Sequence, residues 1–131
     1  MSRKTYARIS AKNLLHNLDV VKKIANKSKI MAVVKANAYG HNVEIVANAI
    51  KNQVDGFGVS QIGEAIELRK LGIKNKILLL EGVFDYNEMS IVQELELDIV
   101  IHSKYQFEYL KQYNNETNNI HKPIVWIKFD T

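Results

Sequence analysis

Residues 32–41 read AVVKANAYGH, and the fold prediction works outward from this stretch. Residues 30–34 form an apolar run without polar alternation, and this run ends at Lys35. A short continuous apolar run of this kind fits a parallel β-strand that is covered on both faces. In parallel α/β folds, functional groups gather where a strand ends and the next helix begins. Lys35 is therefore a candidate site residue as well as the end of a strand.

Strand and helix patterns alternate along the rest of the chain. Helical spacing of apolar residues, with the expected caps at Ser10 and Ser60, predicts helices over residues 10–27, 42–52, 60–72, 85–95 and 103–113. Short apolar runs predict strands over residues 30–34, 57–59, 77–80, 98–101 and 124–129. The polar residues 114–119 are expected to form a loop. This order, with about 20 to 25 residues per repeat, is typical of βαβ units.

Alternating units of this kind build either an open doubly wound sheet or a closed eight-stranded barrel. The last residues, IVWIKFDT, read as a strand with no helix after it. Because five strands cannot close an eight-stranded barrel, we expect the opening portion of a larger α/β domain. A complete five-stranded open sheet is the alternative.

Composition narrows the function classes. The chain has 131 residues and a net charge of +4, but its basic residues are interspersed rather than clustered as in a nucleic-acid-binding tail. It has no cysteine, and its four histidines lack metal-ligand spacing, so no metal site is expected. No signal peptide or membrane span is evident, and a cytoplasmic protein is the default expectation. Glu64 and Glu67 are interpreted as solvated helix charges.

The residues around Lys35 suggest chemistry. Apolar neighbours disfavour a charged ammonium, and a neutral lysine amine can attack an aldehyde. The alternative is that Lys35 only marks the exit of the strand and extends into solvent. Ala36 and Ala38 leave room for a flat ligand, Tyr39 offers a hydroxyl, and Gly40 allows a tight turn. Residues 41–42 then open a helix whose N-terminus favours anions. Together these features suit a phosphorylated aldehyde cofactor.

The stretch VVKANAYGH resembles the pyridoxal-phosphate lysine motif of alanine racemases, enzymes whose barrel domain belongs to fold type III. FGVSQIGEAIELRKLGI, ILLLEGVF and WIKFDT resemble later segments of that family in the same order. The resemblance implies an α/β fold, a partial TIM-type (β/α)8 barrel with about five parallel strands alternating with helices. Residues 1–131 would be the N-terminal part of the pyridoxal-phosphate-binding barrel domain, with the remaining barrel and a C-terminal β-domain absent.

The resemblance also implies roles for three residues. Lys35 would form the aldimine with pyridoxal 5'-phosphate and act as the base on one face of the substrate, and Tyr39 would help to hold the phosphate. Lys128 matches the lysine that is often carbamylated in the family and that orients an arginine beside the pyridine ring. Strand alternation points Lys128 into the barrel, although an ordinary outward-facing lysine is the alternative. Asn42 stands where the family usually has glycine, a mild change because asparagine tolerates left-handed angles.

The implied activity is the interconversion of L- and D-alanine, which supplies D-alanine for peptidoglycan, in a homodimer. The family's second base is a tyrosine of the C-terminal domain, donated across the dimer, so we expect this chain alone to be inactive. Two alternatives stay open. One is a non-catalytic module that binds the cofactor or a partner, and the other is a different fold type III amino-acid racemase.

Overall fold

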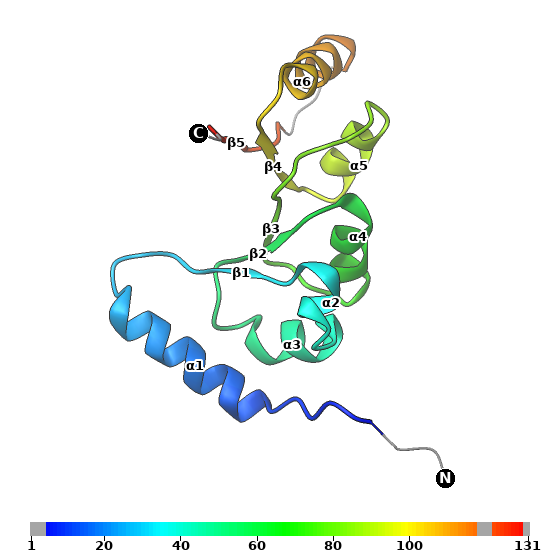
Figure 1. Ribbon diagram of the computed structural model, residues 1–131. Coiled ribbons are helices and arrows are strands. Elements are labelled where there is room, and N and C mark those ends of the chain that lie inside the picture. Colours follow the sequence, from blue (N-terminus) through cyan, green and yellow to red (C-terminus); the bar gives the residue numbers. More distant parts are fainter. Residues whose placement is uncertain (1–4, 118–121, 130–131) are drawn as a thin grey trace.

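The computed structural model describes residues 5–117 and 122–129 (Figure 1). Within them, the strands are β1 (Met31–Val33), β2 (Gly56–Val59), β3 (Lys76–Leu79), β4 (Asp98–Ile101) and β5 (Val125–Ile127). The helices are α1 (Ala11–Ile24), α2 (Lys35–Tyr39), α3 (Val43–Ile50), α4 (Ile62–Lys70), α5 (Glu88–Glu94) and α6 (Lys104–Glu116). Strands and helices therefore alternate as the sequence predicts, except that the short α2, which was not predicted, lies between β1 and α3.

Strand order decides between the two sheet architectures. The five strands form one parallel sheet in the order β1-β2-β3-β4-β5, so each strand pairs with the next along the chain. A doubly wound sheet reverses its strand order at a switch point and carries helices on both faces. Here α2 to α6 follow one side of the sheet, while α1 lies against α3 (Figure 1). The fold is a partial (β/α)8 barrel, and the open doubly wound sheet is wrong.

The two faces of the sheet differ in burial. Residues that point toward the helices, such as Phe57, Ile77 and Ile99, are almost completely buried and form the core. Residues on the opposite face alternate with them, as the period of two requires. At the two outer strands this second face is open, since Val33 and Trp126 are 41% and 49% exposed. This open face corresponds to the interior of a barrel.

Most predicted element boundaries are confirmed to within a few residues, and the differences have local causes. Ser10 caps α1, accepting a hydrogen bond from the Asn13 amide, as predicted. The expected cap at Ser60 is wrong, because Gln61 and Glu64 form a reciprocal capping box at the start of α4. The loop expected from residue 114 is wrong for residues 114–116, which continue α6. Residues 118–119 of that loop lie outside the described residues.

A tyrosine cluster joins the loop before α5 to α6. The ring of Tyr86 meets Tyr109 and Tyr113 edge-on, with centroid distances of 5.8 and 6.3 Å. The hydroxyl of Tyr86 donates a hydrogen bond to Glu116, and this bond raises the pKa of Tyr86 to about 12. The same bond is the main cause of a lowered pKa at Glu116. Tyr109 and Tyr113 of α6 therefore pack against Tyr86.

Candidate functional site

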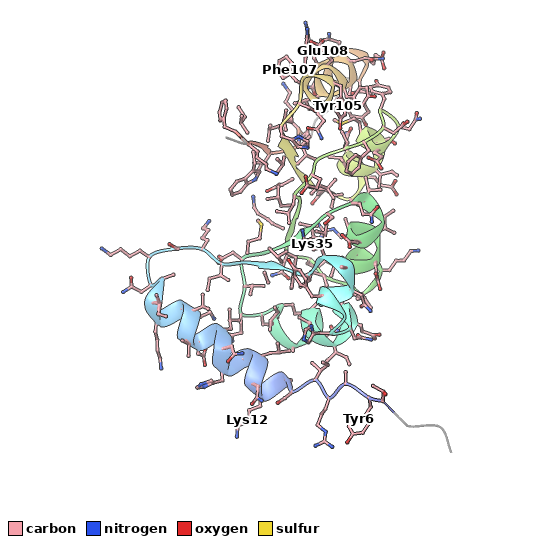
Figure 2. All side chains as sticks on the ribbon, in the orientation of Figure 1. Tyr6, Lys12, Lys35, Tyr105, Phe107 and Glu108 are labelled. Carbon is pink, nitrogen blue, oxygen red and sulfur yellow. The ribbon has the colours of Figure 1, made fainter. Side chains whose placement is uncertain are left out.

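Lys35 follows directly on the end of β1. The amide of Val34 continues the sheet by donating to Gly58 O at 2.9 Å, and the Val34 side chain is buried in the core. Figure 2 shows Lys35 where the chain leaves β1 and enters α2. Its side chain is half-buried. Within residues 5–117 and 122–129, its amine has no hydrogen bond or ion pair, so the amine is available to a ligand.

The backbone after Lys35 is unusual. Ala36, Asn37, Ala38 and Tyr39 all have positive φ angles, between 51° and 54°, so α2 is a left-handed turn after its first residue. Left-handed helical conformation costs L-residues roughly 1–2 kcal/mol each. The sequence predicted positive φ angles only at Gly40 and Asn42, and these residues do have φ angles of 82° and 70°. A run of four strained residues persists only where surrounding contacts over-determine it.

Local hydrogen bonds supply part of that support. The Ala38 amide donates to Val34 O at 2.8 Å, which closes the turn on the end of the strand. The Asn37 side chain accepts a hydrogen bond from the Val43 amide at 2.7 Å, and the His41 ring contacts Ala38 O at 2.9 Å through Nδ1. The asparagine and the histidine of the KANAYGH stretch are thus used to hold its own backbone.

Glu64 supplies the remaining support, from another βα unit. Its Oε1 accepts a hydrogen bond from the Ala36 amide at 2.7 Å. Its Oε2 accepts from the amides of Ser60 and Gln61 at 2.8 and 3.3 Å. The interpretation of Glu64 as a solvated helix charge is therefore wrong. A signal was present in the sequence, because Gln61-x-x-Glu64 is a capping-box pattern, but nothing in it pointed to Ala36.

The other expected features of the site are placed less favourably. Tyr39 is 60% exposed, whereas Ala38 is buried in the core and does not border a space for a ligand. The side chains of Asn37 and Asn42 already occupy two amides in the first turn of α3. Glu44 adds a negative charge to that turn. The anion site expected at the N-terminus of α3 is thus largely used by the protein itself.

Lys128 lies at the other side of the described sheet. Its amide donates to Ile101 O at 3.0 Å, which extends the pairing of β5 with β4 and puts Lys128 on the same face as Trp126. This is the barrel-facing side. Its side chain is 40% exposed, with Nζ 3.9 Å from a carboxylate oxygen of Glu81. Because β1 and β5 are the outer strands, three strands separate the strand that precedes Lys35 from the strand that precedes Lys128.

Two kinds of site were also sought in the described parts of the chain. No group of three histidine, aspartate or glutamate side chains in residues 5–117 and 122–129 could hold a metal ion. In the same residues, no helix combines the length and the apolar content needed to cross a membrane.

Comparison with known proteins identifies the family. Residues 9–131 match the family model described as alanine racemase, N-terminal domain. The chain belongs to this family. The alanine racemase of Actinobacillus succinogenes is 46% identical over 126 residues, which are 95% of this chain and 34% of that protein. The chain thus spans about a third of the length of the curated relatives that it matches, with 34% also covered in the Haemophilus influenzae alanine racemase.

Solved structures agree with the sequence match. The alanine racemase of Acinetobacter baumannii superposes with a TM-score of 0.79 at 42% identity, covering 82% of this chain and 32% of that one. The biosynthetic alanine racemase of Pseudomonas aeruginosa gives a TM-score of 0.81 at 36% identity, covering 91% of this chain and 32% of that one. The family resemblance and the partial-barrel prediction are therefore confirmed.

Proposed function

We propose that residues 1–131 are the N-terminal part of a pyridoxal-phosphate-binding barrel domain, in a protein that interconverts L- and D-alanine. The observation that carries the proposal is Lys35, a half-buried lysine at the carboxyl end of β1, on a strained and hydrogen-bonded turn. In residues 5–117 and 122–129 its amine has no hydrogen bond or ion pair. Active sites of (β/α)8 barrels lie at this end of the strands. Membership of the alanine racemase family supports the choice of reaction.

The residues present fit the cofactor. An amine without an ion-pair partner can attach to an aldehyde, so Lys35 would hold pyridoxal 5'-phosphate covalently. The exposed hydroxyl of Tyr39, four residues away, would donate a hydrogen bond to the phosphate. When bound, pyridoxal phosphate supplies an electron sink for the charge that remains after an α-proton leaves an amino acid.

Lys35 would also move the proton on one face of the substrate. A positioned general base is typically worth about a hundred- to ten-thousand-fold in rate. Racemisation needs a second base on the opposite face, and we propose that this base is a tyrosine outside these 131 residues. The purified 131-residue chain should therefore not produce D-alanine from L-alanine at a useful rate in a chiral amino-acid assay. Turnover near that of a full-length relative would contradict this expectation.

For Lys128 the proposal is an indirect role. In its carbamylated form it would orient an arginine beside the pyridine ring, and its position on the barrel-facing side of β5 is compatible with that. The Lys128 side chain is 40% exposed in the part of the chain that the structure describes. Native mass spectrometry in bicarbonate would reveal a carbamate on this lysine as a mass increase that the Lys128→Met variant lacks.

The wider role follows from the proposed reaction. The whole protein would be a cytoplasmic homodimer whose substrate is alanine, and its D-alanine would enter peptidoglycan.

The test is covalent trapping of the cofactor. The purified chain is mixed with pyridoxal phosphate, its absorbance is recorded, and borohydride then fixes the cofactor to the lysine that holds it. We expect a yellow band, and a trapped adduct that peptide mass spectrometry places on Lys35. The Lys35→Ala variant should lose both, whereas the control Lys12→Ala, at an exposed lysine on α1, should keep both (Figure 2).

If Lys35→Ala traps as much cofactor as the parent, Lys35 is not a privileged site and the proposal is wrong. The chain would then be better studied as a non-catalytic module that binds a partner.

A further inference from the structure

We propose that Glu64 is a positioning residue for Lys35, holding the turn that presents the lysine amine to the cofactor. The inference rests on the proposed function, since it assigns Glu64 a task only if Lys35 holds pyridoxal phosphate. Glu64 lies 29 positions after Lys35 and belongs to the next βα unit, so the link between them is made by the fold.

The carboxylate of Glu64 bridges two βα loops. One oxygen accepts from the amide of Ala36, the residue next to Lys35, at 2.7 Å. The other oxygen accepts from Ser60 and Gln61, in the loop that joins β2 to α4. Hydrogen bonds to an ionised carboxylate are short and roughly twice as strong as neutral ones. Glu64 therefore connects the residues after β1 to the loop between β2 and α4.

This attachment acts at the start of a strained segment. Ala36 is the first of the four left-handed residues, and its amide plane sets the direction in which the Lys35 side chain leaves the backbone. Without Glu64, the Ala36 amide has no acceptor among the described residues, and the strain favours relaxation to ordinary angles. A displacement of about 1 Å at a reacting group can cost on the order of a hundredfold in rate.

A helix-capping role alone would not require the bond to Ala36. The bonds to Ser60 and Gln61 already complete the cap of α4. Glu64→Gln keeps the volume of the side chain but leaves only one acceptor oxygen, because the amide nitrogen cannot accept. One of the two loops is then released. Glu67→Gln is the matched control, since Glu67 lies on the same helix, is exposed, and its side chain has no hydrogen bond or ion pair among the described residues.

Two readouts separate positioning from simple stability. The first is amide hydrogen exchange at Ala36 in the cofactor-free chain, measured by NMR. The second is the pyridoxal phosphate concentration that gives half-maximal borohydride trapping on Lys35. In Glu64→Gln we expect faster exchange at Ala36 and a trapping midpoint raised about tenfold or more, as loss of a hydrogen bond to a charged group implies. Glu67→Gln should match the parent in both.

Rescue sharpens the test. Ala36→Gly introduces a residue that tolerates positive φ angles, so adding it to Glu64→Gln should restore part of the trapping. A purely structural defect in the cap of α4 would not be relieved at residue 36. If Glu64→Gln fails to fold by circular dichroism, Glu64→Asp replaces it. The aspartate keeps the charge but is too short to span both loops, and the same loss of trapping is expected.

The outcomes separate the two proposals. If the parent traps the cofactor on Lys35 and Glu64→Gln traps it equally well, the positioning role is wrong while the proposed function stands. Unchanged exchange at Ala36 in Glu64→Gln also overturns the positioning role. If the parent itself traps nothing on Lys35, the proposed function fails and this inference falls with it.

Discussion

The loop after β1 and the loop after β3 are each held by one side chain from the third position of a helix, which is a hydrogen-bond acceptor in the first case and a donor in the second. In the first, Glu64, the third residue of α4, accepts a hydrogen bond from the Ala36 amide. In the second, Gln106, the third residue of α6, donates from Nε2 to Glu81 O at 2.7 Å and to Val83 O at 3.2 Å. Each side chain also accepts from an amide four residues before it, at Ser60 and at His102.

The comparison shows how one helix position can fasten two βα loops in a barrel. A side chain near the start of the helix that follows one strand bonds to the loop after the preceding strand. Whether that side chain must accept or donate depends on whether the loop exposes amide hydrogens or carbonyl oxygens. The left-handed turn after β1 presents an amide hydrogen, which needs an acceptor. The loop after β3 presents carbonyl oxygens, which need a donor. Lys128 lies directly after β5, and its side chain is 40% exposed.

The largest expected effect on stability comes from replacing the donor side chain at the loop after β3 with an acceptor. Gln106 is 1% exposed, so Gln106→Glu would bury a carboxylate against the oxygens of Glu81 and Val83. A buried charge without a partner costs about 3–5 kcal/mol. We expect a loss of this size in the free energy of unfolding at pH 8, measured by urea denaturation.

The pH dependence of this variant has a defined sign. The carbonyl oxygens raise the pKa of the new carboxyl above its unfolded value, because only the protonated form can donate to them. Stability is then recovered as pH falls toward the unfolded pKa and is lost as pH rises through the folded one. Asn114→Asp, an exposed neutral-to-acid change on the same helix, is the control and should shift stability by less than about 0.5 kcal/mol. A loss no larger than that of the control would mean that the polarity of Gln106 does not matter.

The sequence was sufficient for the features that depend on local pattern. Continuous apolar runs predicted the strands, because burial is encoded in neighbouring residues, whereas the site at Lys35 stays a prediction. The left-handed turn and the role of Glu64 could not be predicted in this way. Nothing in KANAY other than its small residues and asparagine marks positive φ angles, and the Ala36–Glu64 bond joins residues 28 positions apart. Such contacts depend on strand register, which the pattern of one strand does not reveal.

The smallest expected effect is at Lys128, where the described structure shows the least support. Its one ion pair, with Glu81, is 3.9 Å long and both side chains are 40% exposed. Exposed pairs of this kind contribute about 0–1 kcal/mol, and salt screens them. Lys128→Met should therefore leave the urea midpoint of the 131-residue chain almost unchanged and should leave cofactor trapping on Lys35 within about twofold of the parent. The methionine keeps the apolar stem of the lysine, so packing on the open face of β5 is retained. A loss of trapping comparable with that of Glu64→Gln would show that Lys128 already acts on the cofactor within this chain. The expectation that cofactor trapping on Lys35 does not depend on Lys128 would then be wrong.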